Sequence, residues 1–289
     1  MRIVSILFPL FAITALGYLV GRRYRPDLAE ANRLNMEVFT PALVFAVLAG
    51  REIRPADDLP LLGATLAVLA GSGAVGWAVA RWRGIDPRTL VPPMMFSNSG
   101  NLGLPLAVLA FGPDALAPAV VVFAVTNLVH FSFGIWLLDR QARLLDAWRS
   151  PSVLAAFAGV AVSLSGLGVW PPLMTAVRMV GDIAVPLMLL ALGVRMAESR
   201  IGAIGFGLKG ALLRPLAGTA AAWMAAHAFG LPKREQGLLL IYGALPPAVL
   251  NYMFAERYRQ EPDRVASMVL IGNAIAPLVL SVALALVLR

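Results

Sequence analysis

The chain has 289 residues, of which 59% are hydrophobic and 14% are charged, with a mean hydropathy of +0.78. A soluble domain of this length carries about a quarter charged residues, so the composition excludes an ordinary soluble protein and predicts an all-α integral membrane protein. The formal net charge is +8, but 22 of the 24 basic residues are arginines and most lie between apolar blocks, so we expect a lipid bilayer and no nucleic acid as partner.

Ten apolar blocks follow one another along the chain. Each is long enough to cross a hydrocarbon core of about 30 Å, provided that the second block begins near Asp27. The first block is followed by Gly21-Arg22-Arg23 and has no small-residue cleavage site, so we expect a retained helix and not a signal peptide. The ten predicted spans cover about residues 2–20, 34–49, 59–80, 90–111, 116–138, 152–168, 171–194, 206–229, 236–255 and 265–288.

The basic residues predict the orientation of these spans. With the N-terminus outside, the loops on the cytoplasmic side hold 16 basic residues and those on the opposite side hold 6. Cytoplasmic loops are the ones enriched in Lys and Arg. We therefore expect a multi-pass protein of a bacterial inner membrane with both termini on the periplasmic side.

The two halves of the chain repeat one another. Pro41 in the second span matches Pro186 in the seventh at an offset of 145, and Asn127 in the fifth span matches Asn273 in the tenth at an offset of 146. One repeat is thus five spans, and an odd number of spans turns the second copy upside down. Inverted repeats with interrupted helices are typical of secondary transporters, whose binding site lies near the midplane.

The fourth and ninth spans carry helix-breaking residues at matching depths, in the stretches Asn98–Pro105 and Gly243–Pro247. Proline removes a main-chain donor, and in lipid the freed groups are tolerated only beside protein or a water-filled cavity. Both spans are therefore predicted to be broken, crossing helices, with second halves that begin near Leu104 and Ala248. Two helix N-termini that meet near the midplane form a site for a carboxylate.

The candidate substrate-binding residues lie at these two breaks. Asparagine side chains offer both donors and acceptors that orient an anion. The alternative stays open that glycine and proline only allow close packing and that asparagine caps the broken ends. The candidates are Asn98, Asn101, Gly103, Pro105, Pro246, Pro247 and Asn251.

Four further residues are candidates for coupling or support. Glu37 and Asp182 are ionisable groups in apolar spans, where each costs about 2.5–3.5 kcal/mol to insert. Their protonation is one interpretation, and pairing with an arginine, such as Arg178 with Asp182, is the other. Asn127 and Asn273 are predicted to brace the broken helices through hydrogen bonds.

Other polar residues in the spans leave alternatives open. His130 fits a proton relay or a structural, hydrogen-bonded histidine. Arg214 either attracts the substrate anion or anchors to a lipid headgroup. His130 and His227 are too few and too far apart for a metal site, so we expect neither a metal nor a cofactor.

From these motifs the chain is identified as resembling the auxin efflux carrier family, which includes plant auxin exporters and bacterial organic-acid permeases such as malate and malonate permeases. The resemblance covers nearly the whole chain. It rests on Ala244-Leu245-Pro246-Pro247-Ala248-Val249 with Phe254-Ala255-Glu256-Arg257-Tyr258, on the spacing of Asn98, Gly103 and Pro105, and on Asn32-Arg33 with Pro41.

The resemblance implies that the spans form two functional parts, a scaffold and a transport core. In residues 1–145 the first two spans form a scaffold and the next three a transport core, and residues 146–289 repeat this arrangement inverted. It implies a scaffold that forms a homodimer and a core that moves as an elevator. Asn98 is the substrate-binding residue that it supports most directly, with Pro105 and Pro246 shaping the crossover.

The expected function is therefore secondary transport of a small organic anion, a carboxylate. A sodium-coupled bile-acid-type symporter is an alternative, although no cluster of acidic and hydroxyl residues marks a sodium site. A membrane sensor or binding protein is a further alternative, and a channel of the same fold stays open. An enzyme is not expected, because Ser97 and Ser99 have no nearby histidine in the sequence.

Overall fold

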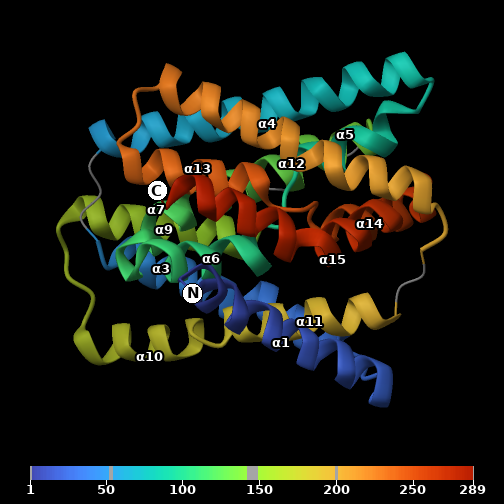
Figure 1. Ribbon diagram of the computed structural model, residues 1–289. Helices are drawn as coiled ribbons and strands as arrows, with labels where there is room; N and C mark the ends of the chain where they lie inside the picture. Colours follow the sequence, from blue (N-terminus) through green and yellow to red (C-terminus); the bar gives the residue numbers. More distant parts are fainter. Residues whose placement is uncertain (1, 52–54, 142–148, 199–200, 289) are drawn as a thin grey trace.

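The computed structural model describes residues 2–51, 55–141, 149–198 and 201–288 (Figure 1). These residues are all helical, and the part of the chain so described contains no strand beyond one isolated bridge. The predicted all-α class is confirmed. Five helical stretches are long and apolar enough to cross a membrane: Arg2–Tyr24, Asp58–Arg83, Pro113–Leu138, Pro171–Glu198 and Pro262–Val287.

The helical elements fall into two successive series. The first series is α1 (Arg2–Tyr24), α2 (Ala29–Leu34), η1 (Asn35–Phe39), α3 (Thr40–Ala49), α4 (Pro55–Arg83), α5 (Pro87–Met95), η2 (Ser99–Gly103), α6 (Leu104–Phe111), η3 (Pro113–Ala115), α7 (Leu116–Val129), η4 (His130–Gly134) and α8 (Ile135–Leu138). The second series is α9 (Pro151–Ser165), α10 (Pro171–Gly181), α11 (Ala184–Glu198), α12 (Ile204–Ala228), α13 (Lys233–Ala244), α14 (Val249–Arg257) and α15 (Pro262–Val287).

Every predicted apolar window is helical over most of its length, but not every window is a single long helix. The fourth and ninth windows are each divided between two helices, and the second contains a π-helical turn before α3. The count of ten spans and the inverted repeat therefore stay predictions.

Two groups of helices lie at opposite edges of the molecule. Figure 1 shows α1, α10 and α11 at one edge and α4 with α12 at the other. In the first group α1 packs on α11. The third member, α10, packs on α3, which also packs on α9. In the second, α12 packs on α4, α13 and α15, while α5 packs on α4.

Glycine permits the closest helix crossing in each group. A Cβ on Gly193 of α11 would overlap the main chain of α1 at Thr14, and a Cβ on Gly218 of α12 would overlap the main-chain carbonyl of Gly243 in α13. Larger residues would hold these helix axes apart.

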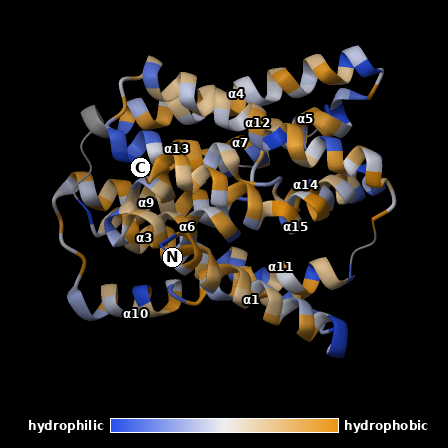
Figure 2. Ribbon diagram, in the orientation of Figure 1, coloured by the Kyte–Doolittle hydropathy of each residue, from blue (hydrophilic) through white to orange (hydrophobic). Residues whose placement is uncertain are grey.

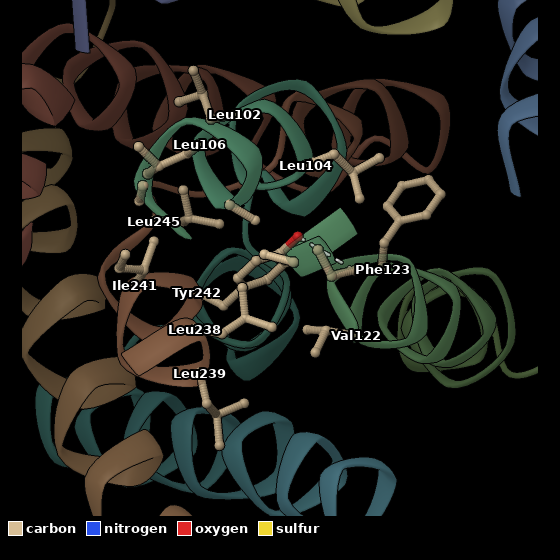
Figure 3. Close-up of a cluster of buried hydrophobic side chains, with 14 of the residues drawn as sticks. Leu102, Leu104, Leu106, Val122, Phe123, Leu238, Leu239, Ile241, Tyr242 and Leu245 are labelled. Carbon is tan, nitrogen blue, oxygen red and sulfur yellow. Dashed lines mark hydrogen bonds between the residues drawn. The ribbon is translucent and has the colours of Figure 1, made fainter. Parts of the chain in front are cut away.

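The centre of the molecule is a buried apolar cluster between the two groups. The ring of Tyr242 on α13 lies among leucines of η2, α6 and α13 and beside Phe123 of α7 (Figure 3). Its hydroxyl donates a hydrogen bond to the main-chain oxygen of Ala119, 3.4 Å away. Figure 2 shows that hydrophobic residues run along most of the helices. Large apolar side chains such as Phe8 and Leu216 are exposed, as expected of surfaces in lipid.

Arginines stack on aromatic rings at the ends of several helices. The guanidinium of Arg140 lies 3.7 Å from the ring centroid of Trp136, and that of Arg83 lies 4.3 Å from Trp82. Aromatic residues and arginines of this kind gather where helices leave the hydrocarbon. Both arginines belong to loops that the sequence assigns to the cytoplasm, and the orientation of the spans stays a prediction.

Candidate functional site

The first break in helical structure follows α5. The chain is extended at Phe96 (φ −103°, ψ 108°), and regular structure resumes at Ser99 in η2, which continues into α6. Asparagine, serine and glycine are poor helix formers, and they occupy positions 98 to 101. Pro105 is the second residue of α6 and follows the π-helical turn η2 directly, so it removes one main-chain donor at this junction.

The second break follows α13. The main chain is extended at Leu245 (φ −59°, ψ 146°) and again at Ala248 (φ −65°, ψ 143°), and α14 begins at Val249. Proline disfavours a helical conformation in the residue before it, so Pro246 and Pro247 end α13. No side chain caps the N-terminus of α14.

The two breaks pair with each other through their main chains. Ser97 and Pro247 form an antiparallel bridge. The N–H of Asn98 donates to the carbonyl of Pro246 at 2.8 Å, and the N–H of Ala248 donates to the carbonyl of Phe96 at 3.0 Å. We call this paired segment, residues 96–98 and 246–248, the crossover. Its pairing satisfies main-chain groups that the breaks remove from the helices.

Asparagine side chains on α14 and α15 hold the crossover from behind. Asn251 donates to the carbonyl of Phe96 at 2.9 Å. Asn273 donates to the carbonyl of Pro247 at 3.1 Å and accepts a hydrogen bond from the side-chain amide of Asn98 at 2.9 Å. These three asparagines are all buried.

A cavity of about 1240 Å³ opens in front of the crossover. Both second half-helices present their first residues to it: Ser99, Gly100 and Asn101 from the first, and Ala248, Val249 and Leu250 from the second. Two helix N-termini, each with unsatisfied N–H groups and a partial positive charge, therefore line one cavity.

The charged residues around the cavity favour an anion. Four arginines and two carboxylates border it: Arg33, Arg149, Arg195, Arg257, Glu37 and Asp139. An excess of one sign in a cleft with apolar walls attracts ligands of the opposite sign.

An aromatic cluster covers one side of the crossover. The ring of His130 stacks on Phe96 at a centroid distance of 4.0 Å and meets the ring of Phe254 edge-on at 5.2 Å. His130 borders the cavity but is only 2% exposed, and within the described residues its Nε2 has no hydrogen-bond partner. The ring of His130 is thus buried and stacked between aromatic side chains, as a structural histidine would be.

The predicted site residues fall into three places. Asn98, Asn101, Glu37 and Asn127 border the cavity. Pro246 and Pro247 are buried within the crossover itself, and Gly103, Pro105, Asn251 and Asn273 are buried outside it. Asp182 is exposed at the junction of α10 and α11, away from the cavity.

Two expectations about arginines change. Arg214 is buried, 1% exposed, and donates to the carbonyl of Gly243 at 2.8 Å, so anchorage to a lipid headgroup is wrong. The sequence could not show this, because the depth of a residue depends on its neighbours. Arg178 and Asp182 form no ion pair in the described part of the chain, where the guanidinium of Arg178 lies near Gly50 instead.

The sequence did not show that α11 contributes to the cavity. Arg195 and Leu192 of α11 border it, although from the sequence Arg195 is only one of the loop arginines that predict the orientation of the spans. A signal was present, since Arg195 lies at the end of an apolar span, where a long side chain reaches back toward the core. No group of three or more potential metal ligands occurs among the residues that the structure describes.

Comparisons with known proteins agree with this picture. The family described as "Membrane transport protein" matches residues 135–284. A "Putative malonate transporter" of Rhizobium meliloti is 27% identical over 215 residues, which are 68% of this chain and 67% of that protein. An uncharacterized transporter of Methanocaldococcus jannaschii is 23% identical over 203 residues, 66% of each chain. The chain thus spans about two thirds of the length of either relative.

Proposed function

We propose that this chain, which belongs to the membrane transport protein family that includes the auxin efflux carriers, carries a small organic anion whose carboxylate binds at the crossover. The family consists of membrane transporters and not of enzymes. One observation carries the proposal: two helix N-termini line a single cavity that arginines border in excess over carboxylates. The relative named for malonate makes short carboxylates the first class to test.

The chemistry of the site suits a carboxylate. Each half-helix presents about half a positive charge at its N-terminus, so together they offset about one negative charge without a buried cation. Asn98 borders the cavity, and its side-chain amide is held by a hydrogen bond to Asn273. Pre-organised donors of this kind bind an anion without a large ordering cost.

The proposed movement is alternating access by an elevator. The scaffold consists of α1 to α3 and α9 to α11, and the core consists of α4 to α8 and α12 to α15, as two inverted copies. The crossover lies wholly within the core, so the site moves with it. The arginines at the cavity belong to loops that the sequence assigns to the cytoplasm, so we propose that the cavity opens to the cytoplasm of a bacterial cell.

Two further features belong to the proposal. The apolar outer faces of the scaffold helices provide the surface for a homodimer. Glu37, which borders the cavity, is the better placed of the two candidate coupling residues, because Asp182 lies away from it.

The experiment is charge movement on a solid-supported membrane with the purified chain in lipid, with short carboxylates added in the presence and absence of sodium. We expect a saturable response that is independent of sodium and is lost in Asn98→Ala. The matched variant Asn32→Ala removes an amide from the scaffold side of the same cavity and should keep most of the response.

Two results would overturn the proposal. No response to any carboxylate would leave the chain without an anion-carrier function. A response that needs sodium would move it to a sodium-coupled symporter. A linear response without saturation would instead favour a channel on this fold.

A further inference from the structure

Arg195 occupies a distinct position among the arginines of the cavity. It lies in the last turn of α11 and is half-buried. Besides the main cavity it borders a small hollow behind the crossover, together with Asn273 and with Val249, the first residue of α14. Among the cavity arginines in the described part of the chain, Arg195 borders both the main cavity and the small hollow.

The other cavity arginines lie farther out. The guanidinium of Arg33 pairs with Glu30 at 3.1 Å, and both side chains are largely exposed. Arg257 follows Val249 by eight residues, which places it about 12 Å along α14 from the crossover. Arg149 precedes α9 in the loop at the cavity mouth.

The wall between Arg195 and the crossover is apolar. Leu192 lies one turn before Arg195 on α11 and also borders both spaces, and Met188 lies a further turn back. Arg195 and the first residue of α14, Val249, border the same small hollow, so the second carboxylate of a short anion bound at the half-helix N-termini would face the side of Arg195.

On these positions we infer that Arg195 binds the second carboxylate of a short dicarboxylate, so that this carrier selects dicarboxylates over monocarboxylates. The inference rests on the proposed function of the crossover. Arginine suits this role, because its planar guanidinium meets a carboxylate with two parallel hydrogen bonds. Because Arg195 belongs to the scaffold, the contact exists only in the cytoplasm-facing position.

The test compares malonate with propionate, which share a three-carbon skeleton and differ by one carboxylate. Half-saturating concentrations are measured by charge movement with the full chain in lipid, for the wild type, Arg195→Gln, Arg195→Lys and Arg257→Gln. Removing a charged hydrogen-bond partner costs about 10- to 100-fold in affinity. We expect Arg195→Gln to lose that factor for malonate while propionate changes by less than about threefold.

The other two variants separate the guanidinium from its charge. Arg195→Lys keeps the positive charge but loses the planar guanidinium that forms two parallel hydrogen bonds. Its half-saturating concentration for malonate should therefore lie between those of the wild type and Arg195→Gln. Arg257→Gln removes the same charge at the cavity rim and should weaken both acids alike, by less than about threefold.

Several outcomes would overturn the inference. If the wild type has the same half-saturating concentration for both acids, or if Arg195→Gln leaves their ratio unchanged, Arg195 does not bind a second carboxylate and the proposed function stands. If Arg195→Gln weakens both acids equally while its melting temperature is unchanged, Arg195 serves the first carboxylate. A wild type that responds to neither acid, nor to any other carboxylate, overturns the proposed function as well.

Discussion

The hydrogen bond between Asn98 and Asn273 should make a measurable contribution to the stability of the crossover. In Asn273→Ala, the side-chain amide of Asn98 and the carbonyl of Pro247 both lose a buried partner. The carbonyl of Val269 loses a bond as well, but a helix carbonyl keeps its main-chain donor. Each unsatisfied buried group costs about 1–3 kcal/mol, so we expect Asn273→Ala to lower the free energy of unfolding by about 2–5 kcal/mol.

A double-mutant cycle isolates the contact itself. Asn98→Ala removes the donor, so in the double variant the loss caused by Asn273→Ala no longer includes that bond. We expect a coupling energy of about 1–2 kcal/mol. The assay is reversible unfolding of the four proteins in mixed micelles with increasing denaturing detergent. Asn127→Ala is the control, because Asn127 borders the cavity without joining the crossover, and it should couple to neither.

Additivity would refute this reasoning. If the two losses sum to within about 0.5 kcal/mol of the double variant, the asparagines act independently and the crossover is held by its main-chain pairing alone. A coupling as large for Asn127 as for Asn98 would mean that the variants disturb the core in general.

Three further predictions concern the packing and the helix ends. Gly218→Ala should lower the melting temperature, because its Cβ would overlap the main chain of α13 and overpacking of this kind costs about 1–3 kcal/mol. Thr89→Val should lower the free energy of unfolding by about 1 kcal/mol, because it removes the 2.6 Å hydrogen bond from the Thr89 hydroxyl to Glu261; an unchanged value would mean that water replaces this contact. Asp86→Ala should cost about 1 kcal/mol at pH 7, because Asp86 caps α5, and unfolding titrations from pH 7 to pH 3 check it. The hydrogen bond from Arg88 holds the pKa of Asp86 below its usual value, so this contribution is fully present above about pH 4 and is lost only as the pH falls through the lowered pKa; a difference that grows as the pH falls from 7 to 3 would contradict it.

The interrupted helices could be located from the sequence, because their cause is local. The two prolines at 246 and 247 end α13, and Asn98 lies in the non-helical segment before η2, although the Ser-Gly-Asn stretch that follows it is π-helical. That Asn98 borders the cavity follows from the same local cause. Hydropathy likewise placed the apolar windows, since each block must find either lipid or a buried neighbour.

Other properties of the site depend on distant neighbours and were out of reach. The pairing of Ser97 with Pro247 joins main chains about 150 residues apart, which no local pattern encodes. Asp182 had the same sequence context as Glu37, yet only Glu37 borders the cavity. The burial of Arg214 and the position of Arg195 at the cavity both depend on how the helices pack. A count of basic residues in the loops could therefore predict neither.

The long separation of the two crossover segments has a consequence for biosynthesis. Chains emerge at about 5–20 residues per second, so residues 96–98 enter the bilayer about 10–30 s before their partners are made. During that interval the carbonyl of Phe96 and the N–H of Asn98 need water, lipid headgroups or the insertion machinery as temporary partners. Ribosome-stalled chains that end before residue 246 should therefore be the form that quality-control proteases degrade fastest.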